Sequence, residues 1–302
     1  MRCIALRMRL FQNPLGLKTW LPSRRRKLFN KTLHPYDLSH QYTSTMNTEF
    51  LRTYGRASRV IHTRFPIIIP MIALLIVTGL LELTGLDLAI SALFYDVQSE
   101  SWPLSDAEPW QTIDEYFIFP GVILGAIATI AGAVACVRWQ WNDRARAAVL
   151  LTWVLIIGPG LLVNVSLKPF FSRPRPREVT ELGGPKTYQP AFGFGDHVHH
   201  NSSFPSGHAS IGFFLIAPAF ACRKRAWRIG LLSAGLCYGS LMSLSRIVQG
   251  GHYLSDTIWS LGILYVTCWA MATLILAVQY HRTRPYVLAI PDEASQSLSK
   301  AA

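Results

Sequence analysis

The sequence predicts an all-α protein that crosses a membrane as a six-helix bundle, and three observations support this fold class. Charged residues make up only 15% of the 302 residues, whereas soluble domains typically carry about 25%. Apolar residues gather in six long segments. The loops between these segments alternate in charge. About 20 apolar residues of helix cross the hydrocarbon core of a bilayer, so the segments are candidate spans.

The six segments differ in how well they meet that length. The first three and the sixth are long enough, whereas the fourth and fifth, taken singly, also fit buried helices of a soluble protein. Their place in a regular series favours spanning, with one end of each lined by polar groups below the membrane surface. The segments are residues 67–83, 116–137, 147–167, 208–222, 229–244 and 257–278.

The domain organisation follows from these segments and from the charge. We expect a basic cytoplasmic N-terminal extension at 1–66, a membrane domain at 67–280 and a cytoplasmic tail at 281–302. The net charge of +12 leaves nucleic acid, an anionic membrane and an anionic substrate open as partners. Only Asp37 and Glu49 oppose the positive charge of residues 1–66, which favours an anionic membrane surface over nucleic acid. Met46 is an alternative to Met1 as the first residue.

Loop charges orient the spans. Cytoplasmic loops are enriched in Lys and Arg, so both termini and the loops after spans two and four are expected in the cytoplasm. The acidic loop after span one then faces the other side, with the loops after spans three and five. One outward loop breaks the rule, because it contains Lys168, Arg173, Arg175, Arg177 and Lys186.

The misplaced basic loop has side chains that suit a phosphate group. Prolines between Lys168 and Arg175 disfavour a helix and predict an extended or turning chain outside span three. Arginine offers a planar fork to two phosphate oxygens, and lysine offers a compact charge. Taken alone, the stretch fits a basic stop after a membrane helix as well.

A second cluster lies where the same loop turns into span four. Ser206 and Gly207 precede His208 at a helix start, where free backbone N–H groups attract anions. Gly207 permits close approach of a ligand, Ser206 offers a hydroxyl, and His208 can supply a proton. A plain helix cap beside a histidine explains this cluster about as well.

A third cluster lies between spans five and six. His252 and Asp256 are four residues apart, so they face the same way on a helical start. A carboxylate bound to one imidazole nitrogen leaves the other nitrogen as a nucleophile. Arg246 adds a further cation. Alone, the histidine and the acid also fit a buried polar pair.

All three clusters fall on the outward side of the topology inferred from charge and hydropathy. They read Lys168-x6-Arg175-Pro176, Pro205-Ser206-Gly207-His208 and Ser245-Arg246-x5-His252-x3-Asp256. This pattern resembles the three signatures of the type-2 phosphatidic acid phosphatase superfamily, and the layout resembles its integral membrane branch. The resemblance implies that Lys168, Arg175 and Arg246 hold a phosphate, helped by Ser206 and the Gly207 amide.

The resemblance also implies a mechanism that uses no metal and no other cofactor. His252 would attack phosphorus and form a phosphohistidine, with Asp256 orienting it. His208 would protonate the leaving alkoxide and then activate water. Histidines at 197, 199 and 200, next to Asn201, raise the alternative of a metal site. A polar loop wall or a substrate contact is the favoured reading of these residues.

The implied substrate is an envelope lipid phosphate: lipid A, undecaprenyl pyrophosphate, phosphatidylglycerol phosphate or phosphatidic acid. Residues 175–210 resemble the lipid A phosphatase branch, although the cysteines that often precede its second signature are absent. The branch implies a bacterial inner membrane with the site facing the periplasm or exterior. Lipid-to-lipid phosphotransfer would use the same residues. Vanadate-dependent haloperoxidases share the site but are soluble, and a vestigial site would have lost signature residues. The oligomeric state stays open.

Overall fold

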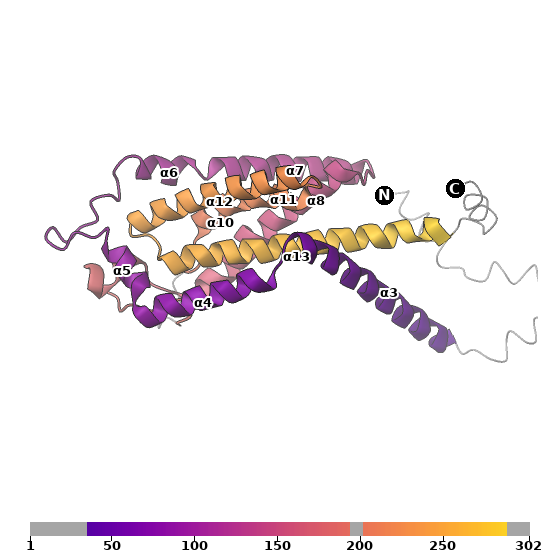
Figure 1. The fold of residues 1–302 in the computed structure, drawn as a ribbon, viewed down its shortest axis with the longest axis horizontal. Helices are drawn as coiled ribbons and strands as arrows, with labels where there is room; N and C mark the ends of the chain where they lie inside the picture. Colours follow the sequence, from indigo (N-terminus) through magenta and orange to yellow (C-terminus); the bar gives the residue numbers. More distant parts are fainter. Residues whose placement is uncertain (1–34, 194–201, 289–302) are drawn as a thin grey trace, which may run out of the picture. The chain divides into compact units, whose positions relative to one another are not determined.

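The computed structural model describes residues 35–193 and 202–288, and in these residues all regular structure is helical. Two isolated backbone bridges, Asp96–Ser101 and Val179–Lys186, are the only strand-like pairings in this part of the chain. The predicted all-α class is therefore confirmed (Figure 1). The chain divides into two compact units, residues 1–52 and 53–302. The signatures lie in the second unit, and the expected boundaries at 66 and 280 stay predictions.

The helices carry the labels of Figure 1. The long helices are α3 (Pro35–Arg64), α4 (Ile68–Thr84), α7 (Phe119–Val137), α8 (Asp143–Leu155), η2 (Ile156–Leu167), α12 (Arg225–Val248) and α13 (Leu254–Leu288). The shorter ones are α5 (Leu86–Ala92), α6 (Trp110–Tyr116), α9 (Lys168–Phe171), η3 (Pro176–Glu178), η4 (Thr180–Leu182), α10 (Gly207–Phe213), η5 (Phe214–Ile216) and α11 (Ala217–Ala221).

Four helical stretches in the described residues are long and apolar enough to cross a membrane: Trp110–Val137, Asp143–Glu178, Arg225–Val248 and Leu254–Arg282. A fifth arises if Phe50–Arg64 and Ile68–Thr84, which are bent by 64° at their junction, count as one span. The expected fourth span corresponds to the shorter apolar stretch Gly207–Ala221. The membrane character is clear, and the count of six spans stays a prediction.

Two of the expected spans are irregular. Span three changes from α8 into η2, which is a π-helix with Pro159 inside it. Proline lacks the backbone N–H of a regular helix. The Asn164 side chain also donates to the Pro159 carbonyl at 2.7 Å. The expected fourth span is three short helices in series, α10, η5 and α11. Such irregular backbone is tolerated at membrane depth where protein surrounds it.

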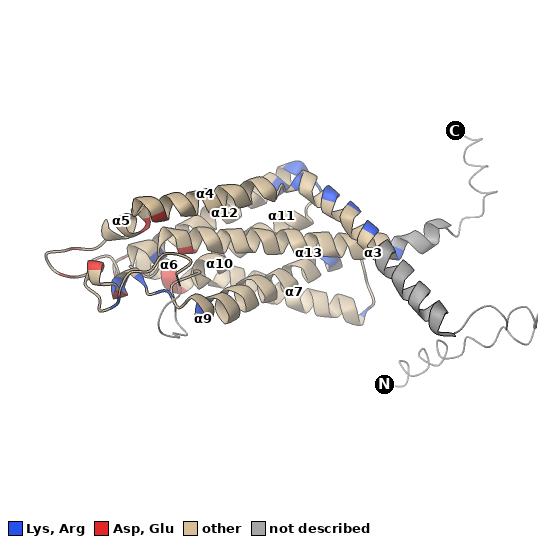
Figure 2. Ribbon diagram, turned by 90° about the horizontal axis from the view of Figure 1, so that it is seen from below, with Lys and Arg blue, Asp and Glu red and all other residues tan. Residues whose placement is uncertain are grey.

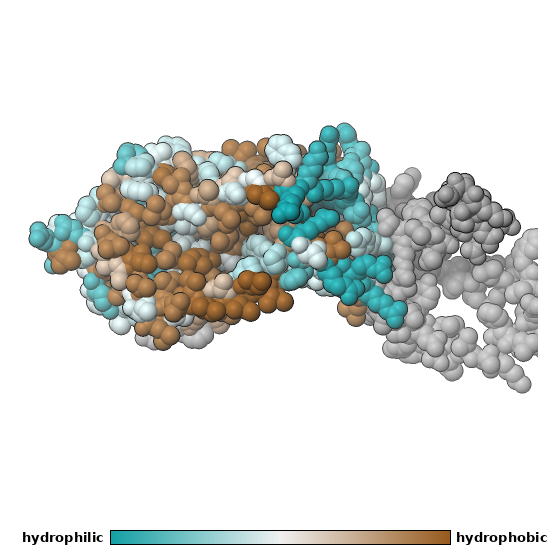
Figure 3. Space-filling model, viewed as in Figure 1, coloured by the Kyte–Doolittle hydropathy of each residue, from teal (hydrophilic) through white to brown (hydrophobic). Residues whose placement is uncertain are grey.

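Large apolar side chains point outward from α4 and α7. Ile69 is 73% exposed and Leu83 88%, while Ile127 and Ile130 are 60% and 66% exposed. Figure 3 shows an apolar surface over the middle of the bundle with hydrophilic residues toward its ends. Exposing so much apolar surface to water is unfavourable, whereas contact with lipid hydrocarbon tails is not. These faces are therefore suited to contact with lipid.

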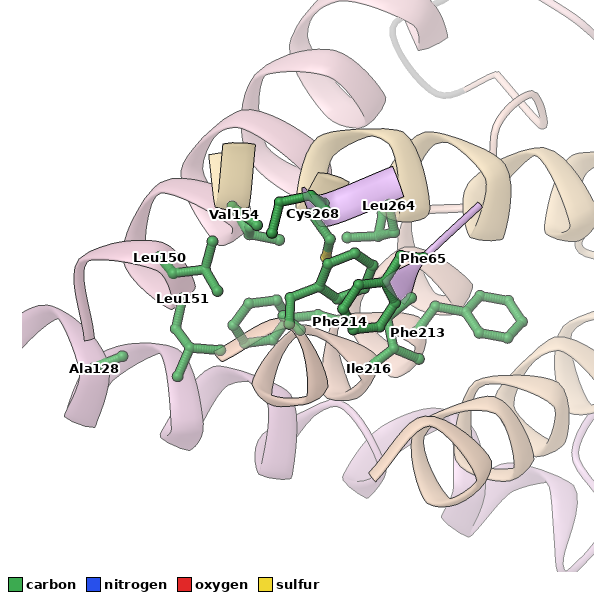
Figure 4. Close-up of a cluster of buried hydrophobic side chains, with 14 of the residues drawn as sticks. Phe65, Ala128, Leu150, Leu151, Val154, Phe213, Phe214, Ile216, Leu264 and Cys268 are labelled. Atoms are coloured by element: carbon green, nitrogen blue, oxygen red, sulfur yellow. The ribbon is translucent and has the colours of Figure 1, made fainter. Parts of the chain in front are cut away.

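The core packs α8, α10, η5, α11 and α13 around aromatic side chains (Figure 4). Phe65 and Phe220 stack with ring centroids 3.8 Å apart. Small residues let α10 approach α12 closely: a Cβ on Gly239 would lie 2.1 Å from the Phe213 ring, and one on Gly212 would lie 2.7 Å from Met242. Glycine at such crossings is typical of helix packing in membranes. The close approach packs the end of α10 against the interior of α12.

Candidate functional site

The structure brings all eight predicted site residues to one end of the bundle. Lys168 opens α9, Gly207 opens α10, Arg246 lies in the last turn of α12, and Asp256 lies in the first turn of α13. The Ser206 backbone N–H donates to the Asp256 carbonyl at 3.3 Å, which ties the start of α10 to α13. The three signatures therefore meet because helix ends meet.

His252 and Asp256 form a buried pair. The His252 Nδ1 lies 3.4 Å from Asp256 Oδ2, and their side chains are 2% and 0% exposed. That distance is long for a hydrogen bond. Burial lowers the pKa of the His252 imidazole to about 4, against a smaller opposing effect of Asp256. The imidazole is therefore neutral at pH 7, with Nε2 as the nitrogen not facing Asp256.

Asp256 is held from several directions. Its Oδ2 accepts hydrogen bonds from the Ser203 hydroxyl at 2.5 Å and from the Tyr253 backbone N–H at 2.8 Å. Its Oδ1 accepts from Arg173 Nη1 at 2.6 Å. A carboxylate with this many donors stays ionised and cannot rotate freely. It can therefore fix the imidazole of His252 in one orientation.

Arg173 is a fully buried cation that the sequence signatures did not assign. Its side chain is 0% exposed, and its two terminal nitrogens bind Asp256 and Asp87 at 2.6 and 2.8 Å. Nη1 also donates to the Ser255 hydroxyl at 2.8 Å, and the guanidinium lies 4.0 Å from the Tyr253 ring centroid. Asp87 closes the network, because it accepts from the Ser255 backbone N–H at 2.9 Å. Buried charges need such complete pairing.

The start of α10 forms a cradle beside the basic residues. The Ser206 hydroxyl caps the helix by accepting from the Ala209 N–H at 3.4 Å. A Cβ on Gly207 would lie 3.1 Å from the Lys168 ammonium and 2.8 Å from the Asn164 amide oxygen. Glycine is required there because of this close approach. Arg175 and Arg246 lie near enough to Lys168 to act on it electrostatically.

His208 shares a carboxylate with Arg246. Asp114, in α6, lies 2.5 Å from Arg246 Nη1 and 3.7 Å from His208 Nε2. The side chains of His208 and Asp114 are 37% and 26% exposed, so water reaches them. Gln249 also accepts from Arg246 Nη1 at 2.9 Å. The Asp114 carboxylate therefore binds the Arg246 guanidinium, which the signatures assign to phosphate binding.

Sequence reasoning missed Asp114, Asp87 and the role of Arg173. The two acids were interpreted as part of the acidic loop after span one, and Arg173 was noted only among the cations of the outward loop after span three. Their spacing from their partners gave no local signal. In residues 35–193 and 202–288, no group of three or more His, Cys, Asp or Glu side chains is placed to hold a metal ion. Histidines 197, 199 and 200, with Asn201, lie outside the described residues.

Residues 147–284 match the family model of the PAP2 superfamily. The match covers 138 of the 302 residues, a little under half of the chain. The resemblance predicted from the three signatures is confirmed, and all eight predicted site residues fall inside the matched PAP2 domain. Asp114 and Asp87 lie outside it, so the site combines residues of the PAP2 domain with residues from the preceding helices.

Three curated relatives are similar to this chain, and each is named lipid A 4'-phosphatase. The protein of Francisella tularensis subsp. novicida is 36% identical over 132 residues, which cover 43% of this chain and 59% of the relative. Those of Rhizobium leguminosarum and Rhizobium etli are 28% and 35% identical, covering 58% and 38% of this chain and 80% and 44% of the relatives. No solved structure matches the chain.

Proposed function

We propose that this protein is an integral membrane lipid phosphatase that hydrolyses a phosphate ester or pyrophosphate of an envelope lipid through a phosphohistidine on His252. The observation that carries this proposal is the buried His252–Asp256 pair beside Lys168 and Arg246. Both cations act electrostatically on His252. A neutral imidazole held by a fixed carboxylate, next to cations, is the arrangement that nucleophilic attack on a phosphate requires.

Binding would begin with the phosphate oxygens. Lys168, Arg175 and Arg246 supply three positive charges, and the start of α10 adds the Ser206 hydroxyl and the Gly207 N–H. Charge on the non-reacting oxygens increases in the transition state of phosphoryl transfer, so cations placed around them stabilise it. Asp114 would have to leave Arg246 when phosphate arrives, because both anions need the same guanidinium.

The first chemical step would transfer phosphorus from the lipid to His252. Nε2 attacks phosphorus, the bond from phosphorus to the ester oxygen breaks, and His208 gives its proton to the departing lipid oxygen. In the second step water loses a proton to His208 and attacks phosphorus. The N–P bond then breaks, which restores His252 and releases inorganic phosphate. No step needs a metal or other cofactor.

His208 is suited to proton exchange because it is not sealed off. Its side chain is 37% exposed, and the Asp114 carboxylate lies 3.7 Å from Nε2. Partial burial and the cations Arg246, Lys168 and Arg175 disfavour the protonated imidazole, and the Asp114 carboxylate opposes them. Once phosphate neutralises those cations, Asp114 would favour the protonated form that the leaving group needs.

A phosphate of lipid A is the first substrate to test, because the three relatives share that name and have similar sequences. Undecaprenyl pyrophosphate, phosphatidylglycerol phosphate and phosphatidic acid contain the same reacting group and belong in the same panel. The site lies at the end of the bundle opposite the basic loops. We therefore place it on the side away from the cytoplasm, at a bacterial inner membrane.

The deciding experiment measures phosphate release from this lipid panel by purified protein in detergent with EDTA present. Wild type is expected to release phosphate, and His252→Ala is expected to show background release only. His62→Ala is a matched control, since it removes a histidine of α3, at the other end of the bundle, and should leave the rate unchanged. Acid-labile phosphate from a labelled lipid should be retained on wild type and lost with His252→Ala.

Two outcomes would contradict the proposal. Equal release by wild type and His252→Ala would remove the nucleophile from the mechanism. Label recovered on a second lipid, with no inorganic phosphate, would show transfer between lipids in place of hydrolysis.

A further inference from the structure

A pocket lies far from the candidate active site. It has a volume of about 440 Å³ and lies among α3, α8, α11 and α13. Leu276 lines this pocket, and Asp256 of the active site lies 20 residues earlier on the same helix, α13. At a rise of about 1.5 Å per residue, the two positions are about 30 Å apart. That is about the thickness of a bilayer's hydrocarbon core, so the pocket belongs to the opposite membrane face.

The pocket is amphipathic. One part of its wall is apolar, with Ile61, Leu150 and Phe220, which also belong to the hydrophobic core. The other part carries Arg64, Arg146 and Arg223. Apolar groups beside a group of cations match the two halves of an anionic phospholipid at the level of its head group.

The arginines of the pocket are only partly neutralised. Among the described residues, Asp143 is the one carboxylate that lines the pocket, and it pairs with both Arg146 and Arg223, the latter at 2.9 Å. Three guanidinium groups against one carboxylate leave two positive charges facing the pocket. Asp143 is 59% exposed, so its two ion pairs are open to water and a phosphate can compete for the arginines.

The helix that carries Arg64 also suits a membrane surface. From residue 53 onward, α3 buries Thr53, Ala57 and Ile61 along one side, at intervals of four residues, while Arg56 and Arg59 are exposed. The helix turns by 64° from the direction of α4. Figure 2 shows basic residues along α3 and at its junction with α4. An amphipathic helix with arginines on its outer face is typical of attachment to anionic lipid.

We propose that this pocket binds the phosphate head group of an anionic phospholipid from the leaflet at the basic end of the bundle. The arginines would hold the phosphate, and the lipid's glycerol and upper acyl carbons would lie against the apolar wall. The bound lipid would join α3 to α8 and α11, which otherwise leave a cavity between them. This lipid is a bound component of the protein and not its substrate.

Native mass spectrometry of detergent-purified protein tests the proposal, with phosphatidylglycerol and phosphatidylcholine of identical acyl chains as probes. We expect wild type to bind phosphatidylglycerol at least tenfold more tightly than phosphatidylcholine. The pocket variant Arg64→Gln/Arg223→Gln should lose this preference. The matched control Arg138→Gln/Arg225→Gln removes two exposed arginines that do not line the pocket, and it should keep the preference.

Further arms separate this pocket from the active site and from misfolding. In a Lys168→Gln background the preference should persist, because Lys168 lies at the other end of the bundle. Arg223→Gln alone, the milder change, should weaken phosphatidylglycerol binding while the protein stays monodisperse in gel filtration.

The proposal fails if the control double variant loses the preference as fully as the pocket variant does, since general charge would then explain binding. It also fails if Lys168→Gln abolishes the preference. Displacement of phosphatidylglycerol by inorganic phosphate at equal concentration would likewise overturn it, because a simple anion site would then suffice. All three results are independent of phosphatase activity.

Discussion

The site contains two pairs of histidine and carboxylate, and they differ in almost every physical respect. His252 and Asp256 are 2% and 0% exposed, and the acid is fixed by Arg173 and Ser203. His208 and Asp114 are 37% and 26% exposed, and their acid is shared with Arg246. The His252–Asp256 pair is shielded from water and held in one position, and we call it the locked pair. The His208–Asp114 pair is open to water and shares its acid with Arg246, and we call it the adjustable pair.

This difference matches what the two proposed roles demand. A nucleophile benefits from being neutral and held in one orientation, and burial supplies both. A group that gives a proton and then takes one from water must reach solvent and change its charge, which partial exposure allows. If the two histidines exchanged environments, each would therefore be poorly suited to its proposed role.

The largest effect should follow from changing the locked acid. Asp256→Asn removes the charge that orients His252 and should lower the rate roughly 10³–10⁴-fold, as loss of the orienting acid does in catalytic triads. Asp87→Asn is the matched control, because it removes the buried carboxylate 2.8 Å from Arg173 without touching His252. It should lower the melting temperature similarly and keep the rate within about tenfold of wild type. Equal rate losses would mean that Asp256 acts only through stability.

The adjustable histidine should show its role through the leaving group. His208→Asn should slow single-turnover release from lipid phosphates by about 10²–10⁴-fold, because an alkoxide needs a proton. Nitrophenyl phosphate has a stable leaving group and should lose far less. A uniform loss across both substrates would indicate that His208 binds phosphate and does not deliver a proton.

The pH dependence of the rate should show that His252 of the locked pair is buried. Burial lowers the pKa of His252 to about 4, so its imidazole stays neutral, with Nε2 free of a proton, above that pH and is lost as a nucleophile below it. Single-turnover release of nitrophenol, corrected for ionisation of the substrate, should therefore hold from pH 7 to 5 and fall near 4. A half-maximal rate near 6.5, the ordinary pKa of histidine, would show that His252 is solvated.

The smallest effect concerns Asp114, which competes with phosphate for Arg246. Asp114→Asn should tighten inhibition by inorganic phosphate roughly two- to fivefold, the range expected for a partly exposed ion pair. The kcat for lipid phosphates should fall, since His208 loses its acidic neighbour. Glu115→Gln removes the next, exposed carboxylate and should change neither constant. Weaker phosphate binding in Asp114→Asn would show that Asp114 organises Arg246 and does not compete.

The sequence predicted the all-α class and the gathering of the eight signature residues at one end of the bundle, because apolar runs and local spacings carry that information. It did not predict the contacts that lock the site. Arg173 and Asp256 are 83 residues apart, and Asp87 and Ser255 are 168 apart. Acids such as Asp87 and Asp114 fitted the charge pattern of an outward loop, which concealed their second role. The π-helix around Pro159 was also outside what hydropathy shows.

Arg173 has a consequence for how the protein matures in the membrane. Its guanidinium joins Asp87, which belongs to the first half of the chain, to Ser255 and Asp256 near the end. A nascent chain that has not yet inserted its last helix leaves Arg173 without its hydrogen bond to Asp256, and Asp87 without the one from Ser255. The same event, docking of α13, completes this hydrogen-bond network and brings Asp256 against His252. Incompletely synthesised protein would thus be both unstable and unable to attack a lipid.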